Sequence, residues 1–110
     1  MYEVKENHKV LSDGTKLTTY QRDVISANIL EVEAGTTGYK GGDTGHGCRT
    51  YFRISDLACT DIDVHVLSNH FGDAKGFEVI LGGDCELETM IRALKFTVKV
   101  LEDGAKEVHE

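Results

Sequence analysis

The chain has 110 residues, with 12 Lys and Arg against 19 Asp and Glu, and so a formal net charge of −7. This length fits one domain, residues 1–110, because typical domains run about 100–150 residues. The acidic balance argues against binding to long nucleic acid, which depends on basic side chains neutralising phosphates. No apolar run approaches the roughly 20 residues of a membrane span, so we expect a cytosolic protein without a membrane partner.

The first elements expected along the chain are strands. Asp13 and Gly14 stand between two short strand-like runs and predict a hairpin with a two-residue turn, because both residue types tolerate a positive φ. Residues 24–32 are rich in β-branched and apolar side chains and predict one central strand. A second strong strand is expected over residues 49–54.

Two further strands are expected before the helix. Residues 61–66 alternate strictly between polar and apolar, which predicts a strand with Ile62, Val64 and Val66 facing the core. Residues 77–81 form a short apolar run and predict another strand.

A helix is expected over residues 84–103. Its apolar residues recur every three or four positions, the spacing of one helix face: Leu87, Ile91, Leu94, Val98 and Leu101. Asp84 is expected to cap the start, and Gly104 to end the helix in the left-handed conformation. A second apolar series, Ala93, Phe96 and Val100, either widens the core face or forms a self-association surface. The fold class is therefore α+β, an antiparallel sheet of about five or six short strands with one C-terminal packed helix.

A glycine-rich segment is the most unusual feature. Residues 35–47 hold six of the 12 glycines and join two predicted strands, where a plain hairpin needs only about two to five residues. Glycines let backbone amides converge on an anion. Residues 35–53 carry a charge of +2 and the remainder of the chain −9, which favours a small anionic ligand. A solvated hairpin tip is the alternative.

The candidate ligand-binding residues come from three places. The glycine-rich segment offers hydroxyls, amides, positive charge and an aromatic ring for stacking: Thr36, Thr37, Tyr39, Lys40, Gly41, Gly42, His46 and Arg49. A loop over residues 68–73 offers Asn69 and Phe71, which suit recognition unless the Phe is buried in a turn. Arg92 on the helix either pairs with Glu88 or holds a phosphate.

Other chemistries fit the sequence less well. Asp43, His46 and Cys48, with His65 or His70, contain ligand types that hold a metal, but their spacing matches no zinc pattern. Residues 43–45 read Asp-Thr-Gly as in aspartic proteases, yet glycines precede them instead of a hydrophobic strand. Since no acid–base pair or nucleophile stands out, we expect capture of a ligand rather than catalysis, with no cofactor. A metal-dependent enzyme or sensor and a protein-interaction module remain the alternatives.

Two segments carry a family resemblance. Residues 28–54 (NILEVEAGTTGYKGGDTGHGCRTYFRI) and 82–103 (GGDCELETMIRALKFTVKVLED) make up about half of the chain. They resemble the Thoeris anti-defence sponge family of phages. The resemblance implies a non-enzymatic homo-oligomer in the host bacterial cytosol that sequesters cyclic ADP-ribose-type signals between protomers, or cyclic oligonucleotides. It also implies a Phe, an Asn and a late Arg as binding residues, for which Phe71, Asn69 and Arg92 are the candidates.

Overall fold

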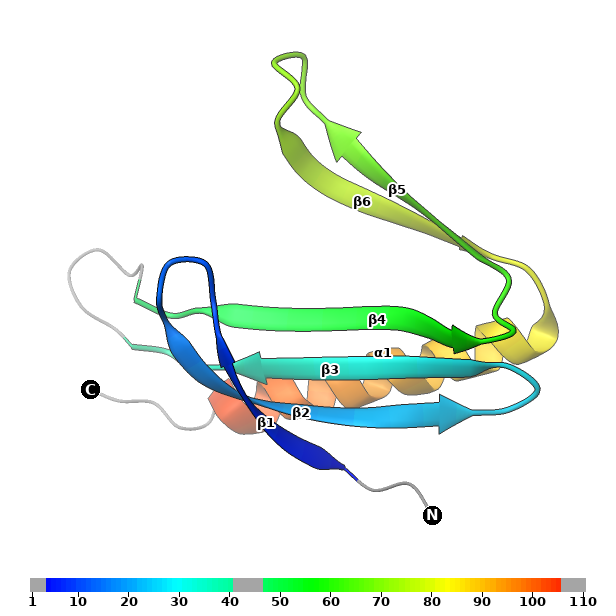
Figure 1. Cartoon of the computed structure of the whole chain (residues 1–110), viewed down its shortest axis with the longest axis horizontal. Helices are drawn as coiled ribbons and strands as arrows, with labels where there is room; N and C mark the ends of the chain where they lie inside the picture. The colour runs from blue at the N-terminus through cyan, green and yellow to red at the C-terminus, as the bar shows by residue number, and fades with distance from the viewer. Residues whose placement is uncertain (1–3, 41–46, 106–110) are drawn as a thin grey trace.

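The computed structural model of the chain describes residues 4–40 and 47–105, and the α+β class is confirmed (Figure 1). Four antiparallel strands form one sheet in the order β1 (Lys5–Val10), β2 (Lys16–Ile25), β3 (Ile29–Thr36) and β4 (Thr50–Ala58). A second, two-stranded sheet consists of β5 (Ile62–Ser68) and β6 (Ala74–Leu81), and helix α1 (Asp84–Ala105) follows. The expected single sheet is therefore divided into two.

The turns of the first sheet depart from the predictions in two places. The hairpin at Gly14, where φ is 89°, is confirmed, but five residues instead of two separate Val10 from Lys16. The prediction of one strand over residues 24–32 is wrong, because the chain turns at residues 26–28 between β2 and β3. Asn28 fixes this turn: it is 1% exposed, and its side-chain amide donates hydrogen bonds to Thr60 and Thr89.

The core lies between α1 and the first sheet. On β3, Leu30, Val32 and Ala34 all face the helix with no exposed surface. Val24 of β2 and Ala93 of α1 complete this fully buried layer. Burying one such aliphatic side chain contributes about 1.5–3 kcal/mol, so this layer holds α1 on the sheet.

The helix presents the opposite face from the one predicted. Leu87, Ile91, Leu94 and Val98 point away from the sheet and are between 43% and 61% exposed. The sheet-facing side instead contains Thr89, Ala93 and Thr97, each at most 5% exposed, with Met90 and Phe96 partly buried beside them. Small side chains are favoured there because α1 packs closely on β3. The second apolar series is thus the core face, and the first series is the outer one.

Gly104 does not end the helix as predicted. The helix continues through it to Ala105, and Gly104 is not among the residues with a positive φ. A Cβ atom at this position would collide with the Thr36 methyl group, so glycine here allows α1 to approach the end of β3.

The second sheet forms an arm that projects from the body of the molecule (Figure 1). Ile62, Val64 and Val66 share one face of β5 as predicted, but that face is not in the core, since Val64 is 53% and Val66 66% exposed. The arm gives the chain a radius of gyration of 15.7 Å, against about 13 Å for a compact domain of this length.

Within residues 4–40 and 47–105, no helix combines the length and the hydropathy that a bilayer crossing requires.

Candidate ligand-binding groove

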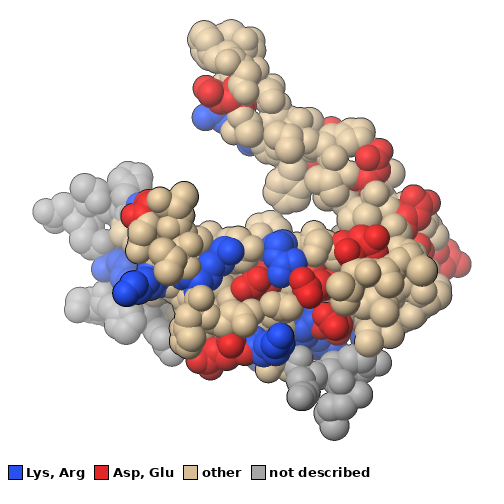
Figure 2. All heavy atoms as spheres, viewed as in Figure 1, with Lys and Arg blue, Asp and Glu red and all other residues tan. Residues whose placement is uncertain are grey.

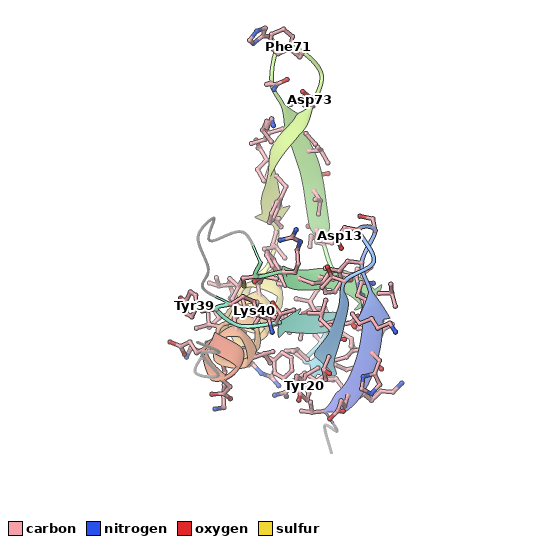
Figure 3. The ribbon with its side chains drawn as sticks, turned by 90° about the vertical axis from the view of Figure 1, so that its left-hand side faces the viewer. Asp13, Tyr20, Tyr39, Lys40, Phe71 and Asp73 are labelled. Atoms are coloured by element: carbon pink, nitrogen blue, oxygen red, sulfur yellow. The ribbon has the colours of Figure 1, made fainter. Side chains whose placement is uncertain are left out.

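A groove of about 740 Å³ lies where the last turns of α1 meet the start of β2 and the end of β3. Pockets for small ligands typically have volumes of about 300–1,000 Å³. Gly35, one of its lining residues, has no room for a Cβ atom against the Thr18 and Thr19 backbone, so β2 and β3 come close together there. Figure 3 shows Lys40 and Tyr20 in the space between the helix and β2.

Basic side chains dominate the groove. Four cations line it, Lys16, Arg22, Lys40 and Lys99, against one carboxylate, Asp103. The groove therefore carries +3 and the rest of the chain −10. Figure 2 shows the face of the sheet opposite to α1, where basic and acidic atoms are interspersed over the strands and acidic atoms gather at the end where α1 begins. The excess of basic charge in the groove attracts small anions despite the negative total.

Two contacts position the groove side chains. The Arg22 guanidinium lies over the Phe96 ring, 5.8 Å from its centroid, and Tyr20, which is 37% exposed, lines the same groove. Lys99 Nζ lies 3.2 Å from an Asp103 carboxylate oxygen, one helical turn away. The C-terminal end of α1 faces this region, and its dipole opposes an anion. The basic side chains must therefore supply the attraction, and the aromatic rings the stacking surface.

Three of the predicted ligand residues line the groove: Thr36, Thr37 and Lys40. The two threonine hydroxyls form hydrogen bonds where the chain enters and leaves the glycine-rich segment, at residues 36–38 and 49, which we call the neck. Thr36 Oγ1 accepts a hydrogen bond from the Gly38 amide at 3.1 Å, and Thr37 Oγ1 accepts one from the Arg49 amide at 3.0 Å. These hydroxyls fix the neck, so Lys40 is the predicted residue best placed to meet a ligand.

Arg49 and Tyr39 lie at the same end of the sheet. The Arg49 guanidinium donates to Asp13 at 2.7 Å, and this hydrogen bond lowers the pKa of that carboxyl to about 2. Arg49 thus ties the β1–β2 turn to the neck. Tyr39 is 63% exposed and precedes Lys40. The Cys48 thiol lies 3.6 Å from the Thr36 hydroxyl, whose hydrogen bond lowers the pKa of the thiol.

The structure does not bring the remaining described candidates to the groove. Phe71 lies at the far tip of the arm (Figure 3), in the same turn as Asn69, whose side-chain Oδ1 accepts hydrogen bonds from the Phe71 and Asp73 amides. Phe71 is 78% exposed. Arg92 donates to the Ile25 carbonyl oxygen at 3.0 Å, at the other end of the sheet.

Several predicted residues lie outside the described part of the chain. These are Gly41, Gly42 and His46 of the ligand set, together with Asp43 of the proposed metal set. Within the ranges that the structure does describe, no group of three or more His, Cys, Asp or Glu side chains is arranged to hold a metal ion.

The sequence reasoning missed Lys16, Tyr20, Arg22 and Lys99. Lys16, Tyr20 and Arg22 lie on β2, separated by even numbers of positions, and therefore share one face of that strand. The alternation of Lys16, Tyr20 and Arg22 was the signal available. Lys99 lies on α1, and the aliphatic pattern of that helix predicts the wrong buried face, so the sequence does not place Lys99 beside β2.

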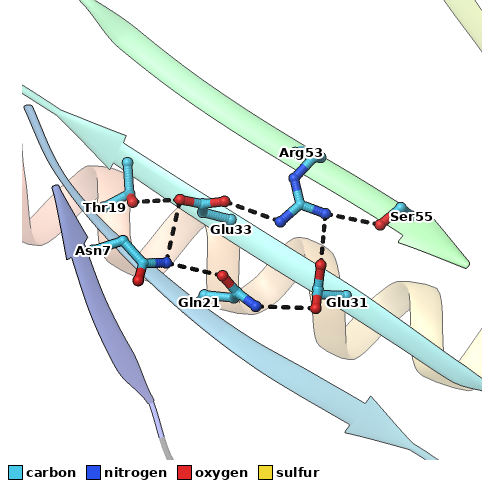
Figure 4. Close-up of polar contacts among 7 residues, drawn as sticks. All are labelled: Asn7, Thr19, Gln21, Glu31, Glu33, Arg53 and Ser55. Atoms are coloured by element: carbon cyan, nitrogen blue, oxygen red, sulfur yellow. Dashed lines mark hydrogen bonds and ion pairs between the residues drawn. The ribbon is translucent and has the colours of Figure 1, made fainter. Parts of the chain in front are cut away.

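The face of the sheet opposite to α1 carries a polar network, which lies away from the groove (Figure 4). Glu33, 7% exposed, accepts hydrogen bonds from Thr19 and from Arg53, the latter at 2.9 Å. Although burial opposes it, these bonds and one from Asn7 lower the pKa of Glu33. Arg53 also donates to Glu31 and Ser55. The Glu31 and Glu33 carboxylates of this network already accept hydrogen bonds, so the network stabilises this face of the sheet.

The same face is strongly curled. Lys9 of β1 lies 4.5 Å from the centre of the Tyr51 ring of β4, although two strands separate β1 from β4. Neighbouring strands lie about 4.8 Å apart, so these two side chains would not meet across a flat sheet.

No protein-family model matches the chain, and searches of curated proteins and of solved structures each find no significant match.

Proposed function

We propose that the protein binds a small phosphorylated, nucleotide-type ligand in the basic groove and holds it without transforming it. The observation that carries this proposal is the convergence of Lys16, Arg22, Lys40 and Lys99 on one groove of a chain whose net charge is −7. Charge-assisted hydrogen bonds from such side chains are the stronger ones that hold phosphate oxygens.

The aromatic side chains support a ligand that also contains a ring. Phe96 and Tyr20 line the groove beside the cations, and the Arg22 guanidinium already lies over the Phe96 ring. A nucleotide whose base stacks on the Arg22 guanidinium and the Phe96 ring would place its phosphates toward the lysines. Cyclic ADP-ribose-type signals and cyclic oligonucleotides combine both features, and they remain the ligands of the proposal, with the bacterial cytosol as its location.

Capture rather than reaction is favoured by the chemistry of the groove lining. Among the described residues that line it, the titratable groups are the basic side chains, Tyr20 and one carboxylate. That carboxylate, Asp103, lies 3.2 Å from Lys99. General acid–base catalysis uses a pair of groups poised near the working pH, and the proposal includes no such pair.

Isothermal titration tests the proposal. Cyclic ADP-ribose isomers and cyclic di- and trinucleotides are titrated into the protein, with pyrophosphate and adenosine as the separated parts of such ligands. Lys40→Ala and Lys99→Ala should each weaken binding about tenfold, the effect of losing one charge-assisted hydrogen bond. Lys95→Ala is the matched control, because Lys95 lies on α1 outside the groove lining.

A flat response to every probe would overturn the proposal, and so would equal losses in all three lysine variants. Recovery of a chemically altered ligand after incubation would replace capture by catalysis.

A further inference from the structure

The four-stranded sheet ends in two edges of different character. β1 forms one edge and β4 the other, because each pairs with a single neighbour among the described strands. β1 carries Lys5 and Lys9, and lysine on an edge strand discourages further pairing. β4 is nine residues long and contains neither Lys nor Pro. The β4 edge is therefore the one that can accept another strand.

Every second residue of β4 directs its backbone groups to this open side. The Thr37 amide donates to the Arg49 carbonyl oxygen at 2.9 Å, so these two residues form a hydrogen-bonded pair of the antiparallel ladder. The β3–β4 register continues from this pair without a shift as far as Asp56. Hydrogen-bonded and non-hydrogen-bonded pairs alternate along such a ladder. The amides and carbonyl oxygens that point outward therefore belong to Thr50, Phe52, Ile54 and Asp56.

An apolar flank of α1 faces the same open side. Ala93 packs on the sheet, and Phe96 lies about 60° round the helix from it, on the flank toward β2. The contact between Phe96 and the Arg22 guanidinium of β2 fixes that direction. Leu87 and Leu94 lie about 100–120° from Ala93 in the other direction, on the flank toward β4. They are 61% and 47% exposed, so the helix offers apolar cover to a strand added beside β4.

The arm bounds the open side from the other direction. Figure 2 shows a notch between the arm and the body, and in Figure 1 β4 runs along its lower border. The strands of the arm, β5 and β6, pair with each other, so they do not fill the position beside β4. The Phe77 ring of β6 reaches Phe52, with the two centroids 6.2 Å apart. Phe77 thus places an apolar ring where the side chain of an added strand would lie next to Phe52.

We infer that the β4 edge binds an extended segment of another protein, which adds a fifth strand to the sheet. The outward amides and carbonyl oxygens supply main-chain hydrogen bonds, as in other cases of strand addition. The segment runs antiparallel to β4, because that pairing is the more stable one.

The side chains along the edge define the chemistry of this segment. Its residues opposite Phe52 and Ile54 are apolar, because they lie beside apolar side chains and under the α1 flank. Its residue opposite Asp56 is basic, because Asp56 and the nearby Asp61 are exposed carboxylates where β4 leads into the arm. The basic groove lies on the β2 side of α1, so this inference is independent of the proposed ligand.

A designed peptide tests the inference. Its sequence, acetyl-Thr-Lys-Thr-Val-Thr-Phe-Thr-amide, places lysine opposite Asp56, valine opposite Ile54 and phenylalanine opposite Phe52. Fluorescence anisotropy of the labelled peptide measures its binding to the full chain. The reversed sequence is the matched control, because it has the same composition but brings phenylalanine to Asp56 and lysine to Phe52. The reversed peptide should bind about tenfold more weakly.

Backbone methylation distinguishes strand pairing from apolar contact alone. N-methylation of the peptide's valine removes an amide that faces β4, and should weaken binding at least about tenfold. N-methylation of the next threonine removes an amide that faces solvent, and should leave the affinity within about twofold. In hydrogen exchange, the amides of Phe52 and Ile54 should gain protection when the peptide is added. Those of Arg53 and Ser55, which point toward β3, should not change.

Two substitutions in the chain should act in opposite directions. Leu94→Gln removes apolar surface from the α1 flank and should weaken peptide binding about tenfold. Phe77→Ala removes the competing ring beside Phe52 and should strengthen binding about two- to tenfold, the strength of one aromatic pair. Ile80→Gln is the matched control, because Ile80 is 56% exposed on the side of the arm away from Phe77. It should leave the affinity unchanged, and circular dichroism checks the fold of each variant.

A flat response to the peptide in both the unsubstituted chain and Phe77→Ala would overturn the inference, whether the arm or a second copy of the chain then covers the edge. Equal binding of the two N-methylated peptides would also overturn it, since it would show apolar docking without strand pairing. The peptide comparisons need no substitution in the chain, so they test the pairing even if a variant fails to fold.

Discussion

The four-stranded sheet and the arm begin from similar sequence patterns and end in opposite environments. Val32 on β3 is completely buried, whereas Val66 on β5 is 66% exposed, although both belong to strands with alternating apolar residues. The first sheet has α1 on one face and a hydrogen-bonded polar network on the other. The arm has neither. Alternation therefore specifies which residues share a face, and burial depends on whether a second layer is present.

The largest expected difference between the two regions concerns leucine truncation. Leu30→Ala should lower the free energy of unfolding by about 2–5 kcal/mol, because it opens a cavity in a fully buried layer. Leu67→Ala, on β5 of the arm and 45% exposed, should change it by no more than about 0.5 kcal/mol. Urea denaturation of both variants measures the contrast. Similar losses would mean that the arm has a core of its own.

Glycine substitution gives a smaller contrast of the same kind. Gly35→Ala should lower the free energy of unfolding by about 1–3 kcal/mol, since the added methyl group meets the Thr18 and Thr19 backbone. At Gly76 on β6 an added Cβ atom lies 3.7 Å from the nearest Leu67 carbon, an ordinary contact. Gly76→Ala should therefore be neutral or slightly stabilising, and its thermal midpoint should stay at or above that of the unsubstituted chain. Equal losses would contradict the close approach of β2 and β3.

The polar network should give the smallest effect, and one that depends on pH. The pKa of Glu33 is lowered in the folded protein. Its contribution is therefore present above about pH 4.3, the ordinary pKa of Glu, and is lost as the pH falls through the lower folded value. Glu33→Gln should cost about 1 kcal/mol at neutral pH and flatten the acid side of the stability profile.

Glu78→Gln on the arm is the control for this change, and it should leave the free energy of unfolding at neutral pH as it is. An acid profile that Glu33→Gln leaves unaltered would show that the network is dispensable.

Much of the fold could be predicted from the sequence, because strand alternation, the Asp13-Gly14 turn and the helical period are local signals. Two features could not. The turn at residues 26–28 depends on Asn28 reaching Thr60 and Thr89, contacts distant in sequence. The orientation of α1 depends on Thr89, Thr97 and Gly104 fitting closely against β3, whereas hydrophobicity alone favours burial of the outward series Leu87, Ile91, Leu94 and Val98.

The candidate site was predicted only in part, for a similar reason. Thr36, Thr37 and Lys40 lie next to the glycine-rich segment that drew attention, and they line the groove. Lys16, Arg22 and Lys99 reach it from a distant strand and from the helix. A site assembled from three elements becomes visible only when the register of β2 on β3 and the rotation of α1 are known.

Hydrogen–deuterium exchange tests the contrast between sheet and arm most directly. Backbone amides of β3 should be the most strongly protected, because β3 pairs with β2 and β4 and α1 covers it. Amides of β5 and β6 should exchange much faster, because a two-stranded sheet without a covering layer opens locally. Protection of the arm equal to that of β3 would contradict this account.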